Sequence, residues 1–120
     1  MLIPKQTVIP SLVRVKPGAL DRVGIYAERD RLMRVVLFFS QDLIRQLMDR
    51  LTASLEARDV RVLEQVSIES ISSEKTIELF QDCPRNADAI IGFGGGKALD
   101  VAKYIAFLSR VPYLAVPTSL

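Results

Sequence analysis

The stretch that decides the fold runs from Ala89 to Lys103 and reads A-I-I-G-F-G-G-G-K-A-L-D-V-A-K. Its first five residues, Ala89–Phe93, form a short apolar run of the kind that makes a strand buried on both faces of a sheet. After the glycines, apolar residues recur on one face from Lys97 to about Ser109, which predicts a helix. A buried strand that turns through glycines directly into a helix is typical of a parallel α/β sheet.

The same alternation of strand-like and helix-like patterns extends outward from this stretch. Upstream, Val35–Phe39 predicts another buried strand, and leucines at every fourth position predict a helix over roughly residues 41–58. The other expected elements are strand Thr7–Val15, helix Ala19–Arg29, strand Val60–Ser67, a helix capped by Ser72 or Ser73 and ending near Pro84, and strand Pro112–Val116. The sequence therefore predicts a doubly wound, mainly parallel α/β sheet of the Rossmann-like type, with about five strands and helices on both faces.

Composition narrows the class of protein. The 120 residues are enough for one domain with its own core, and 49% hydrophobic with 25% charged residues is ordinary for a globular protein. The net charge is only +2, and the basic residues are spread among acidic ones, which argues against nucleic-acid binding. The chain has no histidine, so it cannot by itself assemble a Ser-His-Asp triad, a Cys-His dyad or a histidine metal site.

The same composition bears on the cellular compartment. Cys83 is the one cysteine, so no internal disulfide can form and a reducing compartment is favoured. No apolar stretch approaches the roughly 18 residues of a membrane-spanning helix, and prolines interrupt the N-terminal region where a signal peptide would be apolar. We therefore expect a cytoplasmic protein with no membrane span and no targeting segment.

The glycines Gly94, Gly95 and Gly96, followed by Lys97, are the strongest candidate site. Glycine lets a ligand approach the backbone closely, and the helix N-terminus behind the loop offers unpaired N–H donors and the positive end of the helix dipole. That dipole disfavours a lysine in the first turn, unless an anion such as a phosphate lies between them. A tight turn with an incidental lysine is the alternative.

Neither standard phosphate-binding motif fits this loop. A Walker A sequence would need glycine where Ile91 stands and serine or threonine where Ala98 stands, while Lys97 replaces the third glycine of a G-x-G-x-x-G fingerprint. That fingerprint also follows the first strand of a domain, whereas this loop follows a late one. At the end of the last strand, the hydroxyls of Thr118 and Ser119 suit a phosphate or a ribose, with a helix cap or a turn as the alternative.

The run Ala87–Lys103, with its G-G-G-K-x-x-D-x-x-K pattern, and the downstream V-P-T-S-L at 116–120 resemble the iron-containing alcohol dehydrogenase and dehydroquinate synthase superfamily. The P-T-S-L ending is most similar to its glycerol-1-phosphate dehydrogenase branch, and weaker similarity extends across the whole chain. The resemblance implies that residues 1–120 are an N-terminal NAD(P)-binding domain. The cofactor-binding residues it implies are Gly94, Gly95, Gly96 and Lys97 at the pyrophosphate, Ala98 beside them, and Thr118, Ser119 and Leu120 near the ribose and nicotinamide.

The resemblance also bears on the choice of cofactor. Many NAD-preferring members have an acidic residue just after the strand that corresponds to Val35–Phe39, where this chain has Gln41, with Asp42 one position later. We therefore expect no strict preference for NAD, and use of NADP or of both cofactors; Asp42 alternatively serves only as a helix-start residue. Asp100 and Lys103 match family positions on the helix after the glycines, or form a simple surface pair.

Family enzymes continue into an α-helical domain that supplies an aspartate and two histidines to a divalent metal (Zn, Fe or Ni). The resemblance therefore implies that this chain is a fragment, inactive alone, of a metal- and NAD(P)-dependent oxidoreductase that is a homo-oligomer at full length. The implied reaction reduces dihydroxyacetone phosphate to glycerol 1-phosphate, in phospholipid biosynthesis. The alternatives are a glycerol or alcohol dehydrogenase, a dehydroquinate-synthase-like enzyme, or a non-catalytic flavodoxin-like domain that binds a partner protein or a phosphorylated ligand.

Overall fold

The computed structural model describes residues 12–69 and 73–118 of the chain. These residues form a five-stranded sheet in the order β1-β5-β4-β2-β3, in which every pair of neighbouring strands is parallel. The strands are β1 (Leu12–Arg14), β2 (Arg34–Ser40), β3 (Arg61–Ile68), β4 (Ala89–Gly94) and β5 (Tyr113–Pro117). The predicted doubly wound parallel sheet is thereby confirmed.

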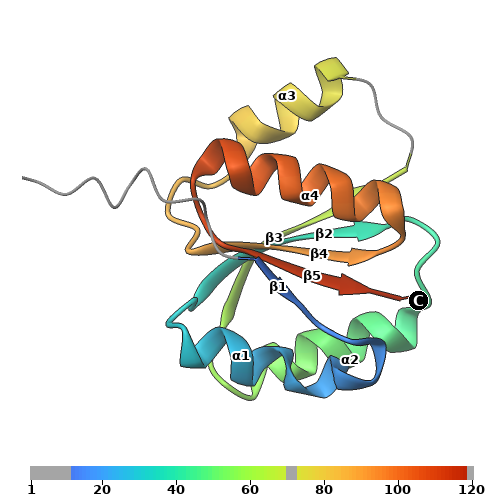
Figure 1. Cartoon of the computed structure of the whole chain (residues 1–120), viewed down its shortest axis with the longest axis vertical. Coiled ribbons are helices and arrows are strands. Elements are labelled where there is room, and N and C mark those ends of the chain that lie inside the picture. Colours follow the sequence, from blue (N-terminus) through green and yellow to red (C-terminus); the bar gives the residue numbers. More distant parts are fainter. Residues whose placement is uncertain (1–11, 70–72, 119–120) are drawn as a thin grey trace, which may run out of the picture.

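Helices cover both faces of this sheet (Figure 1). The 3₁₀ helix η2 (Pro17–Arg22), α1 (Val23–Arg29) and α2 (Arg45–Glu56) lie on one face, and α3 (Ser73–Asp82) and α4 (Gly96–Ser109) lie on the other. The neighbouring strands β2 and β4 are followed by α2 and α4, which lie on opposite faces. The winding of the sheet therefore reverses between β2 and β4, and such a reversal is where open α/β sheets bind their ligands.

The sheet divides the core into two layers, because side chains along a strand alternate between its faces. In β4, Ile91 and Phe93 enter the layer beneath α1 and α2, whereas Ile90 enters the layer beneath α4. In β2 and β5, Val35, Leu37, Leu114 and Val116 join the first layer, and Val36, Phe38, Tyr113 and Ala115 join the second. Strands β2 and β4 are thus buried on both faces, as their continuous apolar runs predict.

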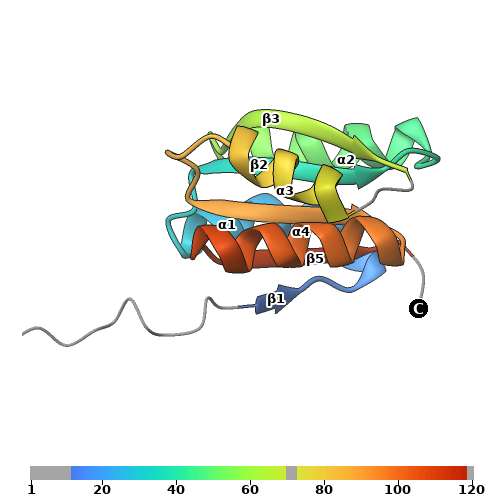
Figure 2. The same ribbon diagram turned by 90° about the horizontal axis from the view of Figure 1, so that it is seen from above.

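Small residues let α4 lie close to the sheet. Ala98, Ala102 and Ala106 are each no more than 1% exposed, and all three belong to the second core layer. Seen from above, α4 runs along β4 and β5 (Figure 2). This placement points the N-terminus of α4 toward the carboxyl end of the sheet.

The first predicted helix, Ala19–Arg29, is the clearest difference from expectation. A 3₁₀ helix begins at Pro17 and gives way to α1 at Val23, with Ala19 in a non-helical conformation at φ −104° and ψ 20°. Gly24 stands inside α1 because α2 passes against it. Its N–H donates to Ser54 Oγ over 2.8 Å, and a Cβ at this position would collide with the backbone carbonyl of Ser54.

The other boundaries differ by a few residues. The helix predicted over residues 41–58 begins only at Arg45, because Ile44 before it is extended, at ψ 131°. Strands β3 and β5 lie one residue downstream of their predicted ranges, and α3 ends at Asp82, before Pro84. Residues 7–11 of the first predicted strand and Ser72 lie outside the described residues. Within the described part of the chain, no helix has the length and apolar character to cross a membrane.

Candidate functional site

The site begins where β4 ends, at Gly94. This residue has φ +130°, a backbone conformation that residues with a side chain rarely adopt. A Cβ at Gly94 would also collide with Ser40, whose own Cβ would be only 2.7 Å away. Backbone conformation and space therefore both restrict this position to glycine, and the resulting turn leads straight into α4.

Gly95 and Gly96 follow without such crowding. The N–H of Gly95 donates a hydrogen bond to the Oγ of Ser40, the last residue of β2, over 2.8 Å. A Cβ at Gly95 would lie 3.8 Å from that Oγ, and a Cβ at Gly96 would have nothing within 4 Å. The missing side chains at these two positions therefore leave open space in front of α4.

The N-terminus of α4 is rich in free donors. Gly95 is the N-cap residue, and among the described residues no side chain caps this helix. The first amides of a helix, here those of Gly96, Lys97 and Ala98, have no acceptor within it, and they carry the positive end of its dipole. The Lys97 side chain is exposed in the same turn, whereas the Ala98 methyl is buried, so Ala98 offers only its backbone. This arrangement suits a phosphate or a diphosphate.

The end of β5 meets the glycine loop, as the sequence predicts for two parallel strands. The N–H of Thr118 donates to the carbonyl oxygen of Gly94 over 3.2 Å, and the Thr118 side chain is exposed. Ser119 and Leu120 lie outside the described residues. One of the three predicted residues after β5 is therefore placed beside the loop.

An open groove of about 440 Å³ lies at the carboxyl edge, where the winding of the sheet reverses. Three segments line it: the end of β2 with the turn after it, the end of β3, and the start of α4. Its lining residues are Ser40, Gln41, Asp42, Ile68, Glu69, Gly95, Gly96 and Lys97. Gln41 and Asp42, which the sequence marks as the residues after the strand, thus lie in one groove with the glycine loop.

Ser40 and Glu69 also line this groove, although no sequence motif predicts them as site residues. Their positions in the sequence could have indicated this, because both residues lie at the carboxyl ends of predicted parallel strands, and such ends meet at one edge of a sheet. The sequence does not show, however, that β2 is the direct neighbour of β4. That neighbour relation brings Ser40 to Gly95.

The charges around the groove are of both signs. Asp42, Glu69 and Lys97 all line it and are exposed. Elsewhere on α4, Asp100 and Lys103 are exposed, and within the described chain no ion pair joins them. In residues 12–69 and 73–118, no cluster of three or more His, Cys, Asp or Glu side chains is arranged to hold a metal ion.

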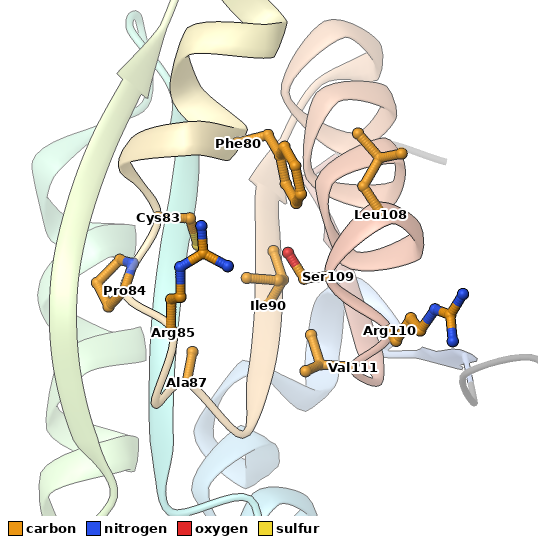
Figure 3. Close-up of a pocket in the computed structure, with 10 residues that line it drawn as sticks. All are labelled: Phe80, Cys83, Pro84, Arg85, Ala87, Ile90, Leu108, Ser109, Arg110 and Val111. Carbon is orange, nitrogen blue, oxygen red and sulfur yellow. The ribbon is translucent and has the colours of Figure 1, made fainter. Parts of the chain in front are cut away.

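A second hollow, of about 180 Å³, lies at the opposite, amino-terminal edge of the sheet (Figure 3). Its walls come from the C-terminal ends of α3 and α4, the loops that follow them and the start of β4, and they include Phe80, Cys83 and Ile90. Burial, together with the nearby Glu64 carboxylate, raises the pKa of the Cys83 thiol. A thiol that stays protonated is a poor nucleophile, and this hollow is separated from the glycine loop by the length of β4.

Comparison with known proteins finds a family model that covers most of the chain. The model described as iron-containing alcohol dehydrogenase matches residues 14–120. A protein of Aeropyrum pernix, named glycerol-1-phosphate dehydrogenase, NAD(P)+, is 29% identical over 117 residues and is matched over 32% of its length and 92% of this chain. A glycerol dehydrogenase of Pseudomonas putida is 33% identical over 108 residues, which are 27% of its length and 83% of this chain.

Among solved structures, the crystal structure of glycerol dehydrogenase from Schizosaccharomyces pombe matches with a TM-score of 0.67. The sequence identity is 24%, over 92% of this chain and 28% of the other, so this likeness concerns the fold alone. The chain spans about a third or less of the length of the curated relatives that it matches.

Proposed function

Because the chain belongs to the iron-containing alcohol dehydrogenase family, we propose that it provides the nicotinamide-dinucleotide site of an oxidoreductase. One observation carries the proposal: the uncapped N-terminus of α4, behind Gly94–Gly96, opens onto a groove at the reversal of the sheet. Relatives that are named as NAD(P)+ dehydrogenases support it.

In this proposal the diphosphate of the dinucleotide lies against the amides of Gly96, Lys97 and Ala98, and the Lys97 ammonium offsets its charge. The adenosine half lies in the groove toward β3, and the nicotinamide half lies toward Thr118, with Ser119 and Leu120 as further predicted contacts. When bound, the dinucleotide carries the hydride that the reaction transfers. The chain itself binds and orients the cofactor and supplies no acid or base.

The groove also bears on the choice between NAD and NADP. Asp42 and Glu69 are carboxylates beside the proposed adenosine position. Carboxylates accept hydrogen bonds from the ribose hydroxyls of NAD, but they repel the additional 2′-phosphate of NADP. We therefore expect NADH to bind more tightly than NADPH, a preference that Gln41 alone does not predict. Lys97 does not offset the repulsion, because in this proposal its ammonium pairs with the diphosphate.

For the whole protein we infer reduction of dihydroxyacetone phosphate to glycerol 1-phosphate, in line with the names of several relatives. Glycerol dehydrogenation is the second candidate, favoured by the Pseudomonas putida relative at 33% identity. The resemblance implies a divalent metal, and the described residues contain no cluster of metal ligands. We therefore propose that the ligands come from the α-helical domain that the resemblance implies. Inactivity of this chain alone, a cytoplasmic location and homo-oligomer formation stay predictions.

The test is a titration of the chain with NADH and NADPH, followed by nicotinamide fluorescence and by calorimetry. The informative variants are Gly95→Asp and Gly95→Asn, since a side chain has room at this position and both residues are good helix N-caps. We expect Gly95→Asp to abolish binding, because its carboxylate competes with the diphosphate for the same donors. Gly95→Asn should weaken binding far less, and neither variant should lower the melting temperature.

Two results would count against the proposal. Unchanged NADH affinity in Gly95→Asp would remove the diphosphate from the glycine loop. A wild-type chain that responds to neither NADH nor NADPH would favour the non-catalytic binding domain.

A further inference from the structure

Ser40 joins two segments of the proposed cofactor site, although no motif marks it. It is the last residue of β2, and its Oγ accepts the N–H of Gly95 over 2.8 Å. Its backbone carbonyl accepts the N–H of Leu43 over 3.0 Å, within the turn that leads to α2. Ser40 therefore fastens the glycine loop to the neighbouring strand across the reversal of the sheet.

The hydroxyl of Ser40 can also donate a hydrogen bond, and no described residue accepts it. A serine hydroxyl can accept one hydrogen bond and donate another at the same time. Ser40 Oγ acts as the acceptor for Gly95, and no described residue accepts its proton. Because Ser40 is only half-buried and lines the groove, that proton is available to an oxygen atom of a ligand there.

The same hydrogen bond redefines the role of Gly95. The amide of Gly95 is already satisfied by Ser40, so the donors left for a ligand are those of Gly96, Lys97 and Ala98. A loop of consecutive glycines has large conformational freedom when nothing holds it. Fixing it before the ligand arrives reduces the entropy that binding must otherwise cost.

We propose that Ser40 is a binding and positioning residue for the dinucleotide diphosphate. Its oxygen holds the amide of Gly95, and its proton is donated to a phosphate oxygen. This inference rests on the proposed function, because the diphosphate is the ligand that both halves of the role require. A hydrogen bond from a neutral hydroxyl to a charged phosphate oxygen belongs to the stronger class.

Three variants separate the two halves of this role. Ser40→Ala loses the acceptor and the donor, Ser40→Thr keeps both, and Ser40→Asp keeps an acceptor for Gly95 but brings a negative charge and no proton. The chain is small enough for amide NMR, so the Gly95 amide resonance reports the loop while NADH fluorescence titration reports the dissociation constant. Ser109→Ala is the matched control, since Ser109 lines the hollow at the opposite edge.

We expect Ser40→Ala to raise the NADH dissociation constant about tenfold or more, which is the loss of one charge-assisted hydrogen bond, and to shift the Gly95 amide resonance. Ser40→Thr should restore both readouts to near wild type. Ser40→Asp should keep the Gly95 resonance close to wild type and yet bind NADH more weakly than Ser40→Ala. Ser109→Ala should change neither readout.

Distinct results would overturn each statement. If the wild-type chain binds NADH and Ser40→Ala binds it within twofold, Ser40 is not a binding residue. If the Gly95 amide resonance is unmoved in Ser40→Ala, Ser40 does not position the loop, whatever the affinity. If the wild-type chain binds neither NADH nor NADPH, it is the proposed function that fails, and the proposed role of Ser40 fails with it.

Discussion

The three consecutive glycines are alike in sequence and different in structure. Gly94 is required by its positive φ and by the closeness of Ser40. Gly95 gives its amide to Ser40. Gly96 has open space where a side chain would be. The motif therefore combines one structural glycine with two positions where the missing side chain leaves open space, which the diphosphate fills in the proposed function.

A pair of alanine substitutions tests this distinction. We expect Gly94→Ala to destabilise the fold by about 1–3 kcal/mol or more, because it forces a side chain into a strained conformation beside Ser40. Gly96→Ala should be neutral or stabilising by up to about 1 kcal/mol, since alanine is the better helix former. Urea unfolding measures both, and equal losses of stability would contradict the assignment.

Asp88 anchors the amino-terminal edge of the sheet. Its Oδ2 accepts the backbone N–H groups of Met33 and Arg34, each over 3.0 Å, and its Oδ1 pairs with the Arg34 guanidinium at 2.9 Å. The side-chain hydrogen bond from Arg34 lowers the pKa of Asp88, against the opposing effect of burial. The carboxylate is therefore more acidic in the folded chain than in the unfolded one.

Because its pKa is lowered, Asp88 stabilises the fold at neutral pH and loses this effect in acid. The contribution of Asp88 is fully present above the ordinary aspartate pKa, about 4, and it is lost as the pH falls through the lowered pKa of the folded state. We expect Asp88→Asn to be less stable than wild type at pH 7, with a gap that narrows toward pH 3. Urea unfolding at both pH values measures the gap, and a gap of constant size would show that the ion pair does not contribute.

Among the elements, the contact of α1 with α2 departs most from the sequence expectation. Gly24 is a poor helix former within α1, yet it is the residue against which Ser54 of α2 packs. Ser54 Oγ accepts the Gly24 N–H and donates to the carbonyl oxygen of Asp21 over 2.9 Å. A glycine that weakens α1 in isolation therefore allows α1 and α2 to approach.

The change in stability on Gly24→Ala has opposite signs according to helix propensity and according to the packing of α1 against α2. Helix propensity alone predicts that Gly24→Ala stabilises α1 by about 1 kcal/mol. The packing predicts a loss of about 2 kcal/mol or more, because the new Cβ meets a backbone carbonyl that cannot rotate away. Ile25→Ala, on the partly exposed neighbour, is the control and should cost less. Thermal unfolding of the two variants decides, and a more stable Gly24→Ala would refute the packing argument.

For the whole molecule, the carboxyl edge collects every segment that the proposed function uses. The ends of β2, β3, β4 and β5 meet there, and α4 directs its N-terminus to the same place. A ligand that binds across these ends ties together strands on both sides of the reversal. Binding should therefore be visible as global stabilisation.

The size of that stabilisation follows from mass action. At an NADH concentration about 100 times its dissociation constant, the folded state gains about 2.7 kcal/mol. We expect NADH to raise the melting temperature of the wild-type chain by several degrees and to leave that of Gly95→Asp unchanged. Differential scanning calorimetry measures both, and equal shifts in the two proteins would place the binding away from the glycine loop.

The sequence by itself determined the class of fold, the order of its elements and the position of the glycine loop. These features depend on short stretches of sequence. A run such as Ala89–Phe93 indicates a strand buried on both faces, and a glycine cluster between a strand and a helix indicates a turn. Only the tertiary structure decided which distant segments touch. Gly95 meets Ser40 across 55 positions of sequence, and Gly24 meets Ser54 across 30. The spacing of apolar residues shows which side of its own strand or helix a residue faces. It does not show which other strand or helix packs there, because that depends on how all the elements pack together.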